Sequence, residues 1–254
     1  MTVLKLSKPL LLLALALALP AHAEPVCPNP GKQIEPTHLR FSLTHSQVPG
    51  QLAITEHVLN VQGDQYKLSS VSQAKGMLAV MFSGQLLQNS EGVIDPKVGL
   101  VPRMYSEKRG KKPVAEVVVD NQQTITFRKN NTTAPFSPGL QDRLSMVYQL
   151  SALLKCSAST PKAGEVWPLK VMSTGRVTPE QFVMKGTEEL TLNLPQGNKK
   201  VTAIQFETKP ENADDDLIRV WYAKSMGWVP VRIQVAEQDG KSITQTLVGT
   251  GPQE

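Results

Sequence analysis

The sequence has little of three things that would mark a specialised class: cysteine, charge of one sign and long apolar runs. Its 254 residues contain 2 cysteines, and 27 basic side chains stand against 22 acidic ones. So few cysteines exclude a small disulfide-dense scaffold. A single long apolar run, at the N-terminus, excludes a protein that crosses a membrane many times. A net charge of +5 is too small to indicate nucleic-acid binding.

Motifs that carry chemistry are also missing. The sequence has no GxSxG nucleophile motif, no glycine-rich phosphate loop and no HExxH, HxH or CxxC metal pattern. Glu188 and Glu189 are adjacent, so on a strand they point to opposite faces. The acidic run 214–216 reads as a solvated loop. We therefore expect no cofactor and no metal, and a non-enzymatic protein is favoured.

The N-terminus is typical of a secretory signal peptide over residues 1–23. Lys5 and Lys8 precede ten apolar residues, Leu10–Leu19. Ala21-His22-Ala23 is a small-x-small site, so cleavage is expected between Ala23 and Glu24. The alternative, an uncleaved anchor, would need about 20 apolar residues. Without the leader, 25 basic side chains remain against 22 acidic ones, a net charge of about +3.

The two cysteines, Cys27 and Cys156, would both remain after cleavage. In an oxidising compartment an isolated pair is more often bridged than free. A disulfide would tie the N-terminal lead-in, residues 24–37, which is expected to be extended, to the end of a predicted helix. The alternative is a pair of free thiols.

Most of the remaining chain predicts short strands. Val229, Val231, Ile233 and Val235 alternate with other residues, as in a strand with one face in water. Similar patterns, bounded by turn residues, place strands near 38–45, 51–60, 65–72, 77–83, 84–89, 114–120, 123–128, 166–173, 179–185, 190–194, 201–206, 217–222 and 242–249.

One segment breaks the alternation. From Leu140 to Cys156 the apolar residues are spaced by three and four, which predicts a helix. An apolar sheet face needs a cover. The fold expected is mainly β: a long curved antiparallel sheet or partly open β-barrel, with one helix at about 140–156 against it. Residues 38–251 would form a single domain.

Several short motifs, in order, resemble the bacterial domain-of-unknown-function 3108 family. They are Ser90-x-Gly92, Gly99-Leu100-x-Pro102, Asp120, Gln141-Asp142-x-Leu144-Ser145, Trp221-Tyr222-Ala223 and Val229-Pro230-Val231-Arg232-Ile233. The resemblance covers residues 38–249. It implies an exported, β-rich bacterial protein of uncharacterised function, localised in a Gram-negative periplasm, with kinship to curved-sheet lipoprotein carriers. The chain departs from the family where His45, His57 and Asn60 replace aromatic residues, which puts an aromatic-lined pocket in doubt.

Two of these positions, His45 and His57, could meet if the first two strands form a hairpin around Pro49-Gly50. A metal site needs three or four ligands at fixed geometry, so half-buried or surface histidines are the simpler interpretation.

A basic stretch holds Arg103, Lys108, Arg109, Lys111 and Lys112, opposed only by Glu107. It is either a solvated hairpin tip or a contact for anionic lipid headgroups.

The leading functional hypothesis is a periplasmic protein that binds a lipid or an apolar segment in the hollow of the sheet. Its candidate ligand-binding residues are Tyr148, Trp221 and Trp228, which could equally be core or rim residues. The rival hypothesis is an envelope-assembly or scaffold partner with a filled core. A weaker one is a hydrolase of envelope polymers. Neither nucleic-acid binding nor integration into the membrane is expected.

Overall fold

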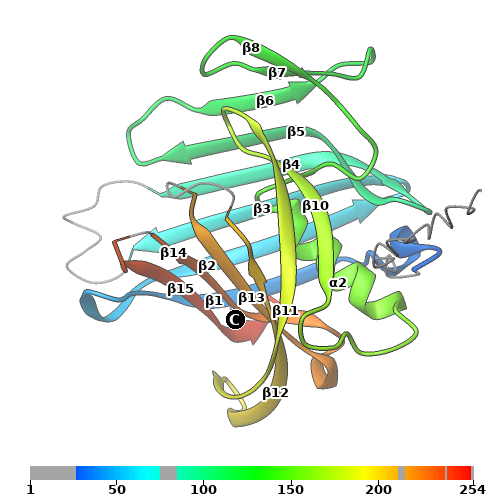
Figure 1. The fold of residues 1–254 in the computed structure, drawn as a ribbon. Helices are drawn as coiled ribbons and strands as arrows, with labels where there is room; N and C mark the ends of the chain where they lie inside the picture. Colours follow the sequence, from blue (N-terminus) through cyan, green and yellow to red (C-terminus); the bar gives the residue numbers. More distant parts are fainter. Residues whose placement is uncertain (1–26, 75–84, 211–214, 238, 253–254) are drawn as a thin grey trace, which may run out of the picture.

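The computed structural model describes residues 27–74, 85–210, 215–237 and 239–252. Its strands form one sheet of 15, in the spatial order β8-β7-β6-β5-β4-β3-β2-β1-β15-β14-β13-β12-β11-β10-β9 (Figure 1). Neighbouring strands are antiparallel, except that β9 and β10 are parallel. The strands are β1 (Thr37–His45), β2 (Val48–Gln62), β3 (Gln65–Ala74), β4 (Leu86–Asp95), β5 (Gly99–Arg109), β6 (Ala115–Val119), β7 (Thr124–Phe127), β8 (Thr132–Pro135), β9 (Gln141–Asp142), β10 (Val166–Met172), β11 (Val177–Leu194), β12 (Gly197–Thr208), β13 (Leu217–Ala223), β14 (Val229–Ala236) and β15 (Ser242–Thr250).

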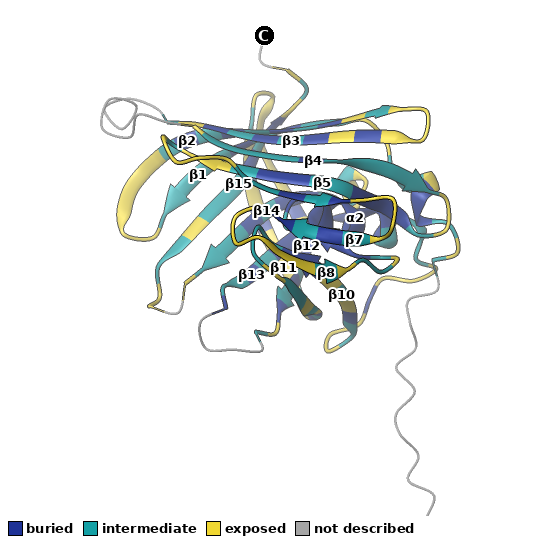
Figure 2. Ribbon diagram, turned by 90° about the horizontal axis from the view of Figure 1, so that it is seen from above, coloured by how far each residue is buried: buried dark blue, intermediate teal, exposed yellow. Residues whose placement is uncertain are grey.

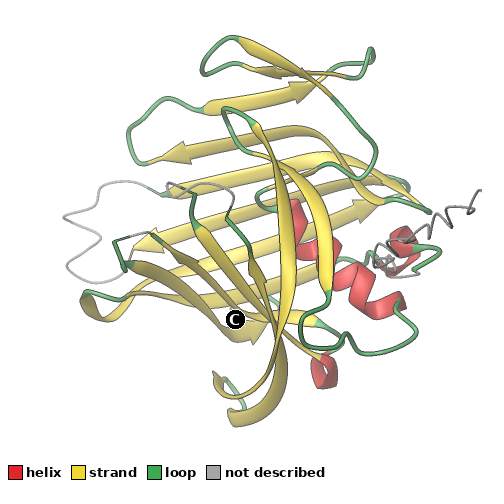
Figure 3. Cartoon of the chain, in the orientation of Figure 1, coloured by secondary structure: helices red, strands yellow, loops and turns green. Residues whose placement is uncertain are grey.

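The sheet curls around α2 (Ser145–Cys156), as the helix inside the strands of Figure 3 shows. One end strand, β9, contacts β5, which lies three strands in from the other end, and there Gln141 Nε2 donates to the carbonyl of Leu100 at 2.7 Å. The ladder does not close, because β8 and β9 remain its end strands. The prediction of a mainly β, curved and open sheet with a helix against it is confirmed.

The helix begins later than predicted. Instead of starting at Leu140, it starts at Ser145, and Gln141–Asp142 forms β9. The reason is local: Asp142 Oδ1 accepts hydrogen bonds from the backbone N–H groups of Leu144 (2.8 Å) and Ser145 (2.7 Å). An Asp side chain that bonds the backbone two and three residues on favours a turn over helix interior.

Most predicted strands are present, but β5 and β8 match no predicted strand. Arg103, Lys108 and Arg109 of the basic stretch, predicted as a hairpin tip, belong to β5. The segments 179–185 and 190–194 are one long strand, β11, with a register shift between Met184 and Gly186. The predicted strand 77–83 lies outside the described residues.

The β1–β2 hairpin turns at residues 46–47 rather than at Pro49-Gly50. Its register pairs His45 with Val48 and His57 with Leu39. The two histidines therefore lie at opposite ends of the ladder, and the suggested meeting of His45 and His57 is wrong.

The segment before β1 is tied to the helix. Cys27 and Cys156 form a disulfide, with Cα atoms 5.3 Å apart, as predicted. Lys155 Nζ also donates to the carbonyl of Gln33 at 3.3 Å. Within the lead-in expected to be extended, residues Pro30–Gln33 form a 3-10 turn, η1. The expected signal peptide, with Ala23 and Glu24, lies outside the described residues.

The core lies between α2 and the inner face of the sheet (Figure 2). Ser145 to Ala152 of the helix are all buried, because strands surround it. Tyr222 Oη of β13 donates to the Val147 carbonyl of α2 at 2.8 Å. The side chain of Tyr222 therefore lies on the face of β13 that packs against the helix. No helix within the described residues is both long and apolar enough to cross a membrane.

Candidate functional site

The three predicted ligand-binding aromatics do not come together. Tyr148 points from α2 into the interior, and its Oη lies 3.1 Å from Nδ1 of His57. Trp228 lies beside the same helix, where its carbonyl accepts from Ser151 Oγ at 2.8 Å. Trp221 precedes Tyr222 on β13, so it points to the face opposite the helix.

The interior beside Tyr148 is tightly filled. The crevice that reaches this ring has a volume of about 20 Å³ and is bounded by α2, the segment before β1, and β14. A volume of that size holds about one water molecule. The hollow predicted for a lipid is therefore occupied by helix α2 and the core side chains of the sheet.

A polar depression lies on the opposite, outer face. It has a volume of about 510 Å³ and spans β11 to β15 and β1. We call it the outer groove; its lining residues are Thr44, Glu188, Gln205, Arg219, Trp221, Arg232, Gln234, Thr244 and Thr246.

Strand register builds the outer groove from cross-strand rows. Trp221 pairs with Gln205 on one side and Arg232 on the other, and Arg232 pairs with Thr246. Directly paired residues in a sheet share a face. Polar residues that alternate with buried Val and Ile on four separate strands thus line up across one surface.

Trp221 forms the centre of the groove. Its Nε1 donates to Glu188 Oε2 at 2.7 Å. The guanidinium of Arg232 lies 5.4 Å from the centre of the Trp221 ring, and it also forms an ion pair of 3.3 Å with Glu188. The indole is therefore held by a carboxylate at its edge and stacked under a cation.

A second ion-pair network lies in the neighbouring row. Arg219 Nε donates to Glu207 at 2.7 Å, and Arg219 Nη1 donates to Gln234 Oε1 at 2.8 Å. Burial acts to raise the pKa of Glu207, but hydrogen bonds from Arg219 and Lys185 outweigh it and hold that pKa below its usual value. A general acid needs a carboxyl that stays protonated near neutral pH. Glu207 is instead held ionised, which suits binding better than acid catalysis.

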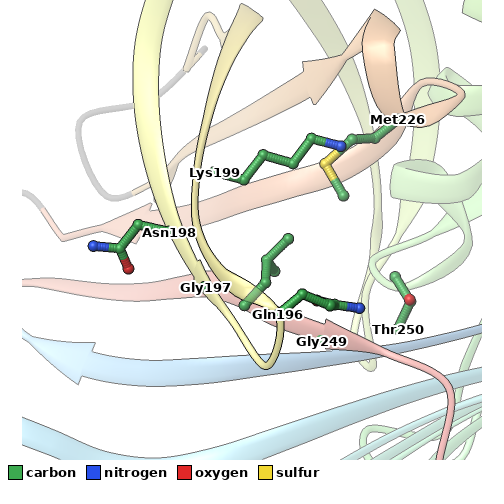
Figure 4. Close-up of a pocket in the computed structure, with 8 residues that line it drawn as sticks. Gln196, Gly197, Asn198, Lys199, Met226, Gly249 and Thr250 are labelled. Carbon is green, nitrogen blue, oxygen red and sulfur yellow. The ribbon is translucent and has the colours of Figure 1, made fainter.

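Two further depressions flank the long β11–β12 hairpin. β11 contacts β15, although three strands separate them in the sheet. A depression of about 410 Å³ beside the outer groove shares Thr246 with it and includes Thr191 and Asn193 of β11. Figure 4 shows the other, about 460 Å³, where the hairpin turn meets Met226 and the end of β15.

The predicted basic residues lie at the end of β5 and in the turn after it. Lys108, Arg109, Lys111 and Lys112 are exposed. Arg109 pairs with Glu107, and this hydrogen bond raises the pKa of Arg109. The structure thus separates one paired arginine from three lysines.

Known proteins resemble this chain both in sequence and in fold. A sequence model of DUF3108, a protein family of unknown function, matches residues 49–248. The chain belongs to the DUF3108 family. This confirms the resemblance drawn from the short motifs. A comparison with curated proteins found no match.

Among solved structures, this DUF3108 chain is similar to the crystal structure of a β-barrel-like protein of the domain of unknown function DUF1849 from Brucella abortus. The match covers 86% of this chain and 98% of that one, with 9% sequence identity and a TM-score of 0.51. At that identity the likeness concerns the fold alone.

Two DUF3108 motif residues, Ser90 and Asp142, meet beneath the N-terminus of α2. Ser90 Oγ donates to Asp142 Oδ2 at 2.5 Å, and the hydroxyl of Tyr66 lies 2.9 Å from Ser90 Oγ. All three side chains are buried. Burial raises the pKa of Asp142 to about 6, against hydrogen bonds that lower it.

Gln149 holds the helix to the start of β5, beside the motif residues Gly99 and Leu100. Gln149 Oε1 accepts from the N–H of Leu100 at 2.9 Å, and its Nε2 donates to the carbonyl of Val98 at 2.8 Å. A Cβ on Gly99 would lie 2.3 Å from that Gln149 side chain, and one on Gly92 would lie 2.1 Å from the Val101 carbonyl. Gly99 therefore allows close packing of the helix against β5, and Gly92 allows the close approach of β4 and β5.

Sequence reasoning found Trp221 but missed its partners Glu188 and Arg232, and Arg219 in the neighbouring row. Arg219 and Arg232 lie on predicted strands, where they alternate with apolar residues, whereas Glu188 lies between the predicted strands 179–185 and 190–194 and belongs to β11. The polar, water-facing positions of a single strand can be read from the sequence. Which of them become neighbours across strands depends on the register, which the sequence pattern does not give.

Proposed function

We propose that this chain is a non-enzymatic protein of the bacterial periplasm that binds a partner protein of the cell envelope in the outer groove. One observation carries the proposal: the inside of the sheet is filled by α2, while a ligand-sized polar groove centred on Trp221 lies on the outside. The disulfide between Cys27 and Cys156 supports an oxidising compartment.

The groove chemistry favours a protein over a sugar chain. A sugar ring would stack on an open aromatic face, but Arg232 already covers the ring of Trp221. Arg is enriched where protein interfaces gain most of their binding energy, and Arg232 lies over the buried ring of Trp221 on the groove side. Rows of amides, hydroxyls and both charge signs match the mixed donors and acceptors of a protein surface.

Lipid carriage has less support than partner binding. A lipid or apolar segment would need space inside the sheet, and the crevice at Tyr148 holds about 20 Å³. Such a ligand would have to displace α2, which the disulfide and the Gln149 hydrogen bonds hold in place.

The test uses a photo-crosslinking residue at Gln234, inside the groove, in cells that make the full chain. The matched control carries the same residue at Ser69, on β3 far from the groove. We expect a discrete crosslinked protein from the Gln234 position only, and its loss when Arg232→Glu is added. Equal products at both positions, or a glycan product, would contradict the proposal.

Native mass spectrometry of the gently purified protein gives an independent check. A bare chain mass is the expected result. An additional mass of lipid size, removed by organic extraction, would revive the carrier hypothesis and overturn partner binding as the main activity.

A further inference from the structure

The turn that follows β5 concentrates unpaired positive charge. We call residues Lys108–Lys112 the basic turn; with Glu107 they carry four basic side chains and one acidic one. Lys108, Lys111 and Lys112 are exposed, and within the part of the chain that the structure describes none of the three forms an ion pair. The fourth cation, Arg109, is bound to Glu107.

The acidic groups near the basic turn are already matched by arginines. Glu107 pairs with Arg109, and Glu116 at the start of β6 pairs with Arg128 at 3.0 Å. Asp216, whose negative charge also raises the pKa of Arg109, pairs with Arg143 at 3.5 Å. The three lysines therefore have no acidic partner among the described residues, and their side chains are exposed.

Apolar surface lies directly beside these lysines. Val114 is 55% exposed, the highest value among the large apolar residues of the described chain, and Pro113 before it is exposed too. The turn projects at one side of the sheet, where β5 ends and β6 begins (Figure 1). A protruding turn with lysines around an exposed valine has the two components of a peripheral membrane contact.

We propose that the basic turn rests on the anionic phospholipid headgroups of a bilayer, with Val114 at the headgroup boundary. Lysine ammonium groups attract a surface of lipid phosphates through charge, and the attraction adds up over neighbouring lysines. This inference rests on the turn alone and is independent of the outer groove. In this proposal Arg109 holds the turn through its ion pair with Glu107, and the three lysines contact the lipid headgroups.

The experiment is co-sedimentation of the purified full chain with vesicles. Vesicles of phosphatidylethanolamine with phosphatidylglycerol supply the anionic surface, and phosphatidylcholine vesicles supply the neutral one. We expect binding to the anionic vesicles only, with a bound fraction that falls as salt is raised. The variant Lys108→Glu/Lys111→Glu/Lys112→Glu should lower the partition coefficient by about tenfold or more.

The control variant is Lys199→Glu/Lys200→Glu/Lys209→Glu, which changes the net charge equally at exposed lysines of β12 and its end. It should bind as the unaltered protein does, and both variants should unfold at the same temperature as that protein. Equal loss in both variants would mean that net charge, not the turn, governs binding. Unchanged binding of the turn variant, or equal binding to neutral vesicles, would likewise overturn the proposal.

Discussion

The hydroxyl of Tyr148 meets Nδ1 of His57 at 3.1 Å and joins helix α2 to strand β2 inside the sheet. His57 also packs against Phe41, with ring centres 4.9 Å apart. Both side chains of the Tyr148–His57 pair are buried. Burial lowers the pKa of His57 to about 4, so the ring is neutral across the physiological range.

The first prediction concerns acid stability through His57. Its folded pKa lies below its ordinary 6.5, so the unfolded chain binds the proton first as pH falls. The native state then loses up to about 3 kcal/mol between pH 6.5 and 4. His57→Gln removes this loss. Urea unfolding from pH 7 to 4 should show the variant gaining stability relative to the unaltered protein. A constant difference at all pH values would contradict the burial argument.

Asp142 should act with the opposite sign. Its folded pKa of about 6 lies above the ordinary 3.8, so the native state binds the proton first. Stability therefore rises by up to about 3 kcal/mol as pH falls from 6 to 4. Asp142→Asn keeps an oxygen for the N–H groups of Leu144 and Ser145 but cannot titrate. Its stability relative to the unaltered protein should be highest at pH 7 and should decline toward pH 4 in the same urea measurement.

Together the two groups offset each other. Between pH 4 and 6 the slopes from His57 and Asp142 have opposite signs, so the unaltered protein should show little net change from this pair. In His57→Gln alone, stability should rise as pH falls through this window. A falling curve in that variant would place the controlling acid elsewhere.

A methyl group at Gly92 should be poorly tolerated. The added Cβ would lie 2.1 Å from the Val101 carbonyl oxygen, and the next nearest atoms are backbone atoms of Pro102 and Arg103, so no flexible side chain can move away. Gly92→Ala is expected to lower the free energy of unfolding by about 2 kcal/mol or more. Gly175→Ala is the control, since its Cβ would meet nothing nearer than 3.8 Å. Equal effects in chemical denaturation would show that the close approach at Gly92 is not what matters.

Removing the disulfide should loosen the N-terminal segment and destabilise the whole chain. The bridge spans a sequence separation of 129 residues. In the chain-entropy account a loop of this length contributes about 2–5 kcal/mol. Cys27→Ser/Cys156→Ser should lower the thermal unfolding temperature, and reductant should lower that of the unaltered protein to the same value. Reductant should leave the double variant unchanged.

The architecture was largely readable from the sequence because alternation on strands such as β14 directly reflects one wet and one buried face. The start of the helix could not be predicted in this way. Leu140 fits the helical spacing, but the Asp142 side chain accepts hydrogen bonds from the backbone N–H groups of Leu144 and Ser145 and so forms a turn there. β5 was missed entirely, because Gly99 and Pro102 are typical of turns and Lys108 and Arg109 end the strand with charge. Local composition reads as a loop where the ladder in fact continues.

The outer groove was beyond sequence reasoning for a different reason. Trp221, Glu188 and Arg232 come from three strands, and their meeting depends on which strands are neighbours and in what register. Tyr148 and Trp221 were grouped by residue type, but they occupy opposite faces. Residue type indicates which interactions a side chain can make, whereas topology determines which partners it meets.

The seam between β1 and β15 has a consequence for how the chain reaches this fold. On either side of it, most ladders join strands adjacent in sequence, so both arms of the sheet can assemble from local hairpins. The seam instead joins Thr44 to Thr244, 200 residues apart. Closing so long a loop carries the largest entropic penalty of any pairing in the sheet. During synthesis or export, the middle of the finished sheet therefore has to wait for the last strand, and the two arms stay unpaired along this seam until it arrives.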